Sequence, residues 1–474
     1  MIIKSKKSLY PGGKSLLLLV VTMLFIALLS GCATDFNAMR TTHALEFSQT
    51  LEQKTKDLIP ENGRLDLETC IEIALANNLD IRIADIKGRL AGLDRKIAFS
   101  YFLPHVDLQY TDLNNDKQQM RKAMTMYVAS SDQDITQWVI SGQLSVFNPS
   151  TWFLYNAYKK GEEIQQLVAE RVRQAIRLQV TGLYIACLSH EATEEAIVSA
   201  VEQAETLVKE MAALFREGLI LKSDLETARL FFASQENRLK ENQRLRFESK
   251  ARLMEAMGLS PLVDITLSGI SALFIEEGEI SEQILDAMIN RLELKISDRR
   301  VSLMEGTIKM AIAAFLPKIV LFGNYTNSSD SYLYYENILS YGISGILTLF
   351  DGFASIQRYK AAKQEHQQAM IQREQSCLKI MLEVINARNL LDRAKDQKVL
   401  LVMERDASVI ALREVEAKWR EGLVTASDRL SAVSRYTAAE ANVNLTDYQY
   451  QVAVATMKDV MGLTGKEEKI EETN

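Results

Sequence analysis

The sequence predicts a mostly α-helical protein with a transmembrane β-barrel portion, built from two copies of one helix-strand-strand-helix unit. Three observations lead to this prediction. Only six of the 474 residues are proline, and a chain so poor in helix breakers favours long helices. Several segments recur at a nearly constant offset along the chain. Two pairs of segments alternate between apolar and small or polar residues, as strands do, and one of these pairs carries no charge.

The N-terminus has the organisation of a bacterial export signal. Four lysines precede an apolar core at 16–29, which is shorter than the about 20 residues that a transmembrane helix needs. The core ends in LSGC (29–32), which resembles a lipobox, where the signal peptide is cut and the new terminal cysteine is acylated. We therefore expect a signal peptide at 1–31, palmitate on Cys32 and a lipid-anchored linker at 32–65. The alternative is an uncleaved anchor that happens to end in cysteine.

Charge and cysteine usage exclude several classes of protein. Removing the signal peptide takes away four lysines and no acid, so the formal charge moves from −7 to −11 (−7 − 4). An acidic chain argues against nucleic acid as a partner.

The residue after Cys32 indicates the membrane. Ala33 stands in place of the aspartate linked in some bacteria to inner-membrane retention, so the outer membrane is the expected location. Cys70, Cys187 and Cys377 are too few and too scattered for a disulfide framework and are expected to be buried thiols.

A tandem duplication organises the rest of the chain. The matching pairs are NNLDIRI (77–83) with NRLELKI (290–296), FLPHV (102–106) with FLPKI (315–319), LSVFN (144–148) with LTLFD (347–351), and MGLS (257–260) with MGLT (461–464). The first two pairs are offset by 213 residues and the others by 203 or 204. The first copy therefore has about ten extra residues between Pro104 and Phe147, where we expect a surface loop.

This comparison fixes the expected domain organisation. The predicted segments are a first repeat at 66–262, an inter-repeat linker at 263–280, a second repeat at 281–464 and a disordered acidic tail at 465–474. Within the repeats, three ranges contain neither glycine nor proline: 219–257, 353–421 and 423–461, of which 353–421 is the longest. A helix over the whole of 353–421 would be about 100 Å long. Such rods are typical of coiled coils or helical tunnels.

Four segments of about ten residues are predicted as strands, at about 105–113, 136–147, 318–327 and 339–350. In the second of them, Trp138, Ile140 and Leu144 fall on one face, and smaller or polar residues fall on the other. This length and alternation match transmembrane β-strands. The alternative is a pair of ordinary soluble hairpins packed on a helix. Four strands cannot close a barrel alone, so a membrane location requires eight strands from a dimer or twelve from a trimer.

The order of these features resembles the TolC-type outer-membrane efflux family. The lipobox, AAFLPKIVLFGNY (313–325), LFDGFASIQRYKAA (349–362) and a twice-written REGL turn carry the resemblance. It implies a homotrimer with a twelve-stranded barrel in the outer membrane and a long helical tunnel in the periplasm. It also implies the exit duct of a tripartite efflux pump or type I secretion system, docked to a periplasmic membrane-fusion adaptor and an inner-membrane pump. It implies no catalytic centre, cofactor or metal.

The repeated turn supplies the candidate site residues. Glycine can adopt the left-handed conformation that ends a helix. The expected turn and adaptor-contact residues are Arg216, Gly218, Leu219, Arg420, Gly422 and Leu423. The resemblance places an acidic ring just after the second turn, where Asp428 is the first position and Ser431 the next; Asp224 is the third gate candidate.

Simpler roles remain open for these residues. Thr425 and Asp428 have capping-box spacing, so the aspartate could be a helix cap and nothing more. Ser223 and Glu226 have the same spacing in the first copy. The arginines could be surface residues without a role, and Phe215 and Trp419 are expected to be packing.

Neither an enzyme nor a metal site is indicated. The four histidines form no sequence cluster, and His190-Glu191 lacks the second histidine of a zinc-protease helix. The alternative function is a lipid-anchored periplasmic coiled-coil adaptor or structural protein without a pore. The charge-free segments 138–147 and 341–350 argue against that alternative.

Overall fold

The computed structural model describes residues 36–59, 64–276 and 278–464. The chain divides into two units, the first ending at Glu61 and the second beginning at Asn62. The first unit contains helix α2 (Phe36–Leu58), where a linker was expected. The helix forms because this stretch contains neither glycine nor proline. Cys32, the signal peptide and the acidic tail lie outside the described residues.

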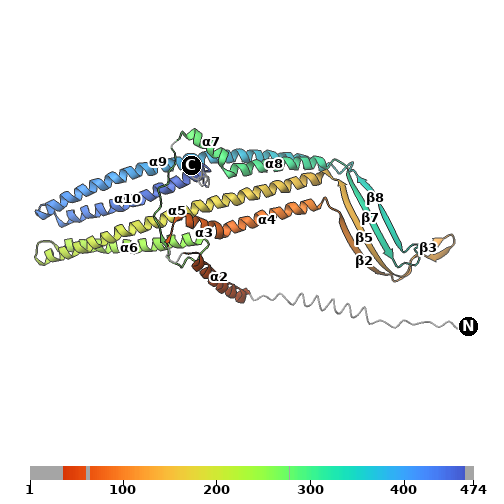
Figure 1. Cartoon of the computed structure of the whole chain (residues 1–474), viewed down its shortest axis with the longest axis horizontal. Coiled ribbons are helices and arrows are strands. Elements are labelled where there is room, and N and C mark those ends of the chain that lie inside the picture. The colour runs from red at the N-terminus through yellow and green to blue at the C-terminus, as the bar shows by residue number, and fades with distance from the viewer. Residues whose placement is uncertain (1–35, 60–63, 277, 465–474) are drawn as a thin grey trace, which may run out of the picture. The chain divides into compact units, whose positions relative to one another are not determined.

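The second unit carries both repeats (Figure 1). The elements of the first repeat are β1 (Arg64–Leu65), α3 (Leu67–Asn77), α4 (Leu79–Ser100), β2 (His105–Asn114), β3 (Met120–Ala123), β4 (Met126–Ala129), β5 (Asp134–Phe147), α5 (Pro149–Arg216) and α6 (Lys222–Ala256). After β6 (Thr266–Leu267), the second repeat consists of α7 (Ile280–Asn290), α8 (Leu292–Ala313), β7 (Lys318–Ser328), β8 (Asn337–Ile346), α9 (Ala354–Arg420) and α10 (Ala426–Val460).

Two very long helices form the frame of this unit. Helix α5 has 68 residues and α9 has 67, so each is about 100 Å long. Helix α5 packs against α4 and then α6, and α9 packs against α8 and then α10 (Figure 1). Contacts of α5 with α8 and α10 join the two repeats. No helix in the described part of the chain is long and apolar enough to cross a membrane.

The shorter helices meet at two equivalent junctions, and glycine is required at each. Gly258 follows α6 with φ +68°, and a Cβ there would lie 2.5 Å from the carbonyl oxygen of Asn77. Asn78 caps α4 and donates from Nδ2 to the carbonyl oxygen of Ala256 at 2.8 Å. Gly462 follows α10 with φ +70°, packed against Asn290. The repeated MGLS and MGLT segments are therefore the sites where one helix ends against a neighbouring turn.

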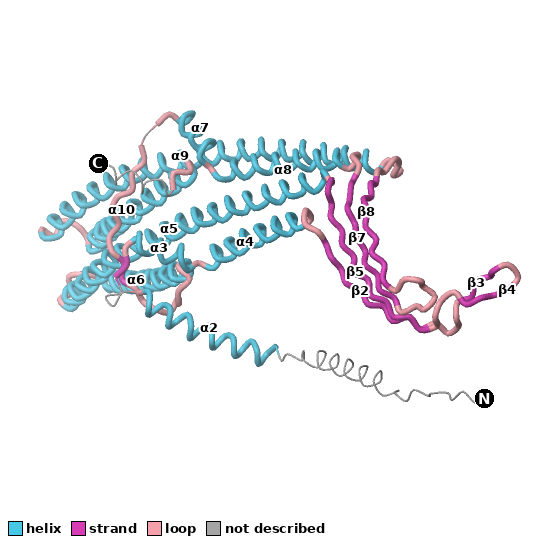
Figure 2. The backbone as a smooth tube through the Cα atoms, turned by 45° about the vertical axis from the view of Figure 1, so that its right-hand side comes forward, coloured by secondary structure: helices cyan, strands magenta, loops and turns pink. Residues whose placement is uncertain are grey.

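A four-stranded antiparallel sheet follows the order β2-β5-β7-β8 (Figure 2). The β5–β7 pair joins the first repeat to the second, and β2 and β8 form the two edges. Leu108 lies opposite Ile140, Ile140 opposite Tyr325, and Tyr325 opposite Leu339. Directly opposed residues share one face of a sheet. The apolar residues that alternate along all four strands therefore form one continuous apolar face.

The structure differs from the expected boundaries in three places. Strand β8 ends at Ile346 and not at residue 350, because Ile346 pairs with Lys318, the first residue of β7, and β8 has no partner beyond it. The extra residues of the first repeat are not a plain loop, since β3 and β4 pair as a second hairpin. The expected inter-repeat linker contains β6, which pairs with β1 in parallel.

Tyr184 of α5 anchors this small β1–β6 ribbon. Its side chain is fully buried, and its hydroxyl donates to the carbonyl oxygens of Ser268 at 2.6 Å and Leu65 at 3.1 Å. Cys70 and Cys187 are buried free thiols, and burial raises the pKa of each to about 12. Such thiols stay protonated and unreactive, as the sequence predicted for these two; Cys377 is only partly buried.

Candidate functional site

Both copies of the REGL turn end a long helix in the same way. Gly218 adopts φ +72° and Gly422 adopts φ +70°. Leu219 donates its N–H to the carbonyl oxygen of Leu214 at 2.9 Å, and Leu423 donates to Lys418 at 2.9 Å. These backward bonds satisfy carbonyl groups that the ending helix leaves free. The repeated glycine is therefore explained by the helix stop that each hairpin needs.

In the second copy, Thr425 and Asp428 form the predicted capping box. The Thr425 N–H and hydroxyl donate to the Asp428 carboxylate at 2.9 and 2.6 Å, and the Asp428 N–H donates to the hydroxyl at 3.2 Å. The hydrogen bonds from the hydroxyl and the N–H of Thr425 lower the pKa of Asp428. Asp428 therefore caps α10 and also keeps an exposed negative charge at the tip.

The first copy is capped differently from the prediction. Leu221 occupies the N-cap of α6, and its N–H donates to the carboxylate of Asp224 at 3.1 Å. Ser223 lies inside the helix, and Glu226 pairs with Arg229 at 3.0 Å. The predicted Ser223–Glu226 box is wrong because Leu221 aligns with Thr425 at the repeat offset. Leucine has no side-chain oxygen, so only half of the box forms.

Arg429 joins the two hairpins of the protomer. Its guanidinium binds Glu416 of α9 at 2.9 Å and Glu210 of α5 at 2.5 Å, and it lies 5.6 Å from the centre of the Trp419 ring. Burial alone would lower the pKa of Arg429, but the two carboxylates raise it above its ordinary value. We call this set of four side chains the tip link.

An apolar cluster lies beside the tip link. Its buried members are Leu207, Met211, Leu225, Ala228 and Ala426, with Trp419 and Leu430 packed against them. At the repeat offset of 204, Leu225 is the counterpart of Arg429. Sequence reasoning missed the tip link, although this change from a buried leucine to arginine at equivalent positions was the available signal. Trp419 packs as predicted and also carries the cation–π contact.

An open groove of about 920 Å³ lies between the two turns. Of the predicted site residues, it brings together Gly218, Leu219, Asp224, Arg420 and Gly422. Arg216, Leu423, Asp428 and Ser431 do not line the groove; Leu423 is 68% exposed, and the other three are also exposed. Leu219 and Leu221 are 67% and 70% exposed, so the first turn presents two exposed leucines and the second presents one.

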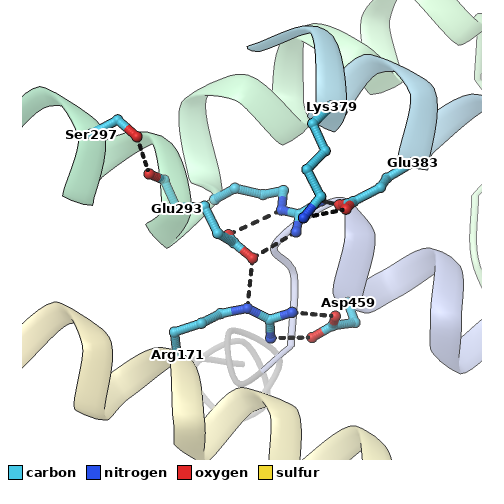
Figure 3. Close-up of polar contacts among 7 residues, drawn as sticks. Arg171, Glu293, Ser297, Lys379, Glu383 and Asp459 are labelled. Carbon is cyan, nitrogen blue, oxygen red and sulfur yellow. Dashed lines mark hydrogen bonds and ion pairs between the residues drawn. The ribbon is translucent and has the colours of Figure 1, made fainter. Parts of the chain in front are cut away.

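A second charged cluster lies where α10 ends against the α7–α8 turn (Figure 3). Arg171 of α5 binds Glu293 of α8 at 2.7 Å and the Asp459 carboxylate of α10 through two bonds of 3.2 Å. Arg291 binds Glu293 at 2.6 Å and also Glu383 of α9, which Lys379 approaches at 3.7 Å. We call Arg171, Arg291, Glu293, Glu383 and Asp459 the junction network.

Two side chains of this network are buried. The side chains of Arg291 and Asp459 are 6% and 5% exposed. Burial would raise the pKa of Glu293, but the hydrogen bonds and charges of Arg291 and Arg171 lower it to about 2. Burial raises the pKa of Asp459 despite its bonds to Arg171. No group of three or more His, Cys, Asp or Glu residues among the described positions is arranged to hold a metal ion.

The architecture is similar to that of solved outer-membrane channels. A structure of CusC shares 16% identity, covers 84% of this chain and 92% of that one, and has a TM-score of 0.73. The Campylobacter jejuni channel CmeC shares 17%, with 88% and 90% covered and a TM-score of 0.73. The open state of Neisseria gonorrhoeae MtrE shares 17%, with 84% and 89% covered and a TM-score of 0.69. These likenesses confirm the predicted fold of the protomer.

The family assignment rests on the sequence itself. No curated protein matches the chain. The family model described as Outer membrane efflux protein matches residues 70–259 and 284–463, which are the two repeats. The chain therefore belongs to the outer membrane efflux protein family, and it is an outer-membrane efflux duct whose helical part lies in the periplasm.

Proposed function

We propose that three copies of this chain close their sheets into one twelve-stranded barrel. The observation that carries the proposal is the four-stranded sheet, which has two unpaired edges, β2 and β8, and one continuous apolar face. Unpaired edges in hydrocarbon cost several kcal/mol for each unsatisfied backbone group. Pairing β2 of one copy with β8 of the next removes every edge.

Aromatic side chains support a membrane position for this sheet. At the helix-proximal end, the Phe147 and Trp152 rings pack at 5.8 Å, as do those of Phe350 and Phe353 at 5.3 Å. At the far end, Tyr334 and Tyr335 pack at 4.7 Å in the loop between β7 and β8. Aromatic girdles at both interfaces are typical of outer-membrane barrels.

The helical hairpins of three copies would then line a passive tunnel that ends at the tips. In this proposal the tips meet a periplasmic membrane-fusion adaptor, and the duct serves a tripartite efflux pump or a type I secretion system with an inner-membrane pump. The exposed Leu219 and Leu423 give each hairpin an apolar contact point for the adaptor. No catalytic step is part of this function. Acylation of Cys32 would add a lipid anchor.

Gating belongs to the same proposal. The tunnel opens when the α5–α6 hairpin separates from the α9–α10 hairpin, and the tip link resists this separation because Arg429 bridges α10 to Glu210 of α5. Asp428 contributes an exposed negative charge beside the opening. Asp224 faces the groove, and Ser431 adds no charge.

The alternative, a lipid-anchored coiled-coil adaptor without a pore, leaves the apolar sheet face without an explanation. Planar-bilayer conductance of the detergent-purified protein, together with its oligomeric mass, separates the two functions. We expect heat-sensitive trimers that conduct ions. A protein that stays monomeric and soluble after its lipid is removed, and that does not conduct, would overturn the proposal.

A further inference from the structure

The β3–β4 hairpin breaks the symmetry of the duplication. Strands β2 and β5 are joined through 115–133, which contains this hairpin, whereas β7 and β8 are joined by the shorter loop 329–336. Both connections lie at the end of the sheet farthest from the helices (Figure 2). Because the helical part lies in the periplasm, this end of the sheet faces the cell exterior.

The two connections carry opposite charge. The connection at 115–133 contains three cations, Lys117, Arg121 and Lys122, and two acids, Asp116 and Asp132, a formal charge of +1 (3 − 2); all three cations lie within 117–131, where there is no acid. The β7–β8 loop contains Asp330 and Glu336 and no base, a formal charge of −2 (0 − 2). In the described part of the chain, none of the three cations takes part in an ion pair. A cluster of unneutralised cations in an acidic protein indicates an anionic partner.

The hairpin is also apolar on both faces. Met124 is 97% exposed at the turn, and Met126 and Tyr127 are exposed on strand β4. Lys122 lies opposite Tyr127 on one face, and Arg121 lies opposite Val128 on the other. Each face therefore combines one cation with bare apolar side chains. A surface that packs on a single protein partner needs only one such face, whereas an element surrounded by lipid headgroups needs both.

The base of the hairpin is held firmly. Gln118 donates from Nε2 to the Tyr332 hydroxyl at 3.2 Å. Asp132 accepts from the Ser331 hydroxyl at 3.1 Å, and its own N–H donates to Asp330 at 3.0 Å. These bonds join the base to the β7–β8 loop, so the hairpin leaves the sheet from an ordered platform (Figure 1). Its place is therefore at the rim of the membrane-spanning sheet.

We infer that the β3–β4 hairpin is a lipid-binding arm that lies in the headgroup layer of the outer leaflet. Lys117, Arg121 and Lys122 bind phosphate groups of anionic lipid, while Met124, Met126 and Tyr127 contact the upper acyl chains. This inference rests on the proposed membrane insertion of the sheet. The competing occupant is the acidic β7–β8 loop of a neighbouring copy.

The test places a polarity-sensitive fluorophore on the arm of the full-length trimer. Met124→Cys carries the label in a Cys377→Ser background, and Leu262→Cys, which follows α6 in the helical part of the protein, is the control, since Leu262 is 82% exposed. Each protein is reconstituted in vesicles of phosphatidylcholine, with or without phosphatidylglycerol or lipopolysaccharide. Acrylamide quenching reports exposure to water, and ion conductance of the same preparation reports insertion.

We expect anionic lipid to protect the label at 124 and to leave the label at 262 unprotected. Each cation near an anionic surface contributes about fivefold to binding. In the variant Lys117→Gln/Arg121→Gln/Lys122→Gln, the affinity of the arm for anionic lipid should therefore fall about a hundredfold, and the label should lose its protection. Raised salt should act in the same direction, because it screens exposed charges.

Two results would overturn the inference. In the first, the protein conducts ions but the label at 124 is quenched equally with and without anionic lipid. In the second, the label is already protected in detergent trimers and the triple variant lowers their heat resistance, which assigns the arm to a neighbouring copy. Loss of conductance in every preparation would instead contradict the proposed duct.

Discussion

Two clusters of charged side chains join the two repeats, and they differ in how far water reaches them. In the junction network, Arg291 and Asp459 are almost fully buried, and five side chains share one set of bonds. In the tip link, Arg429 is 16% exposed and Glu210 is 46% exposed, and a groove opens beside them. Removing one partner of a buried pair is costly, whereas exposed pairs contribute little. The comparison indicates a fixed joint at the junction and a separable contact at the tips.

The largest effect is expected from Arg171→Ala. This change leaves the buried Asp459 carboxylate and Glu293 without a shared cation, which should cost about 3–5 kcal/mol of folding free energy. Thermal and denaturant unfolding of the detergent-solubilised protein measures the loss. Arg244→Ala is the control, because Arg244 is 77% exposed in an i,i+3 pair. Equal stability of the two variants would remove the distinction between the junction and an ordinary surface.

Arg429→Ala should have a smaller effect on stability and a larger one on the channel. Loss of charged hydrogen bonds to Glu210 and Glu416 should cost about 1.5–3 kcal/mol. Because the hairpins lose their bridge, the open probability in planar bilayers should rise. The control is Arg413→Ala, because Arg413 is an exposed residue of α9 outside the tip link; this variant should stay closed as often as the unmodified protein. A channel that opens no more often than this control would separate the tip link from gating.

A pair of substitutions divides the two roles of Asp428. Thr425→Ala removes the capping hydroxyl and should cost about 0.5–2 kcal/mol, but it keeps the carboxylate at the tip. Asp428→Ala removes the cap and the charge together. If the Asp428 carboxylate acts on ions at the mouth of the channel, only Asp428→Ala should weaken the block by added cations. The trimers should stay intact in both variants. Identical block curves for the two variants would leave Asp428 as a helix cap alone.

Acid should weaken the junction by a modest amount. The folded pKa of Glu293, about 2, lies below its ordinary value of 4.5, so its ionisation stabilises the fold above pH 4.5 and this contribution is lost as pH falls toward 2. The raised pKa of Asp459 acts in the opposite direction and reduces the net effect. The unfolding midpoint of the unmodified protein should therefore fall more steeply with acid than that of Glu293→Gln. Parallel pH profiles would contradict this assignment.

Local patterns were enough to predict the protomer fold. The absence of glycine and proline over 353–421 predicts α9 almost to its ends, and the alternation around Ile140 predicts the apolar face of the sheet. The REGL turns and the Thr425–Asp428 box follow from short-range hydrogen bonding. The family match confirms the duplicated plan. The roles assigned to the turn residues stay predictions.

Contacts between distant segments were not predictable in the same way. Arg429 meets Glu210 across 219 positions of sequence, and Arg171 meets Asp459 across 288. Neither pair belongs to a local motif, because each depends on how α5 packs against α10. The extra residues of the first repeat were located correctly, but a surface loop was expected there and not the paired β3–β4 hairpin. Aligning the two repeats shows where residues have been inserted or replaced, but it does not show which residues come into contact.

The separable tip and fixed junction can be tested together by crosslinking in single-channel recordings. A cleavable crosslink between Glu210→Cys and Arg429→Cys should hold the channel closed, and its cleavage should restore opening. A crosslink between Arg171→Cys and Glu293→Cys should leave opening unchanged, because that joint does not move. Free opening with the tips crosslinked, or closure caused by the junction crosslink alone, would contradict this account.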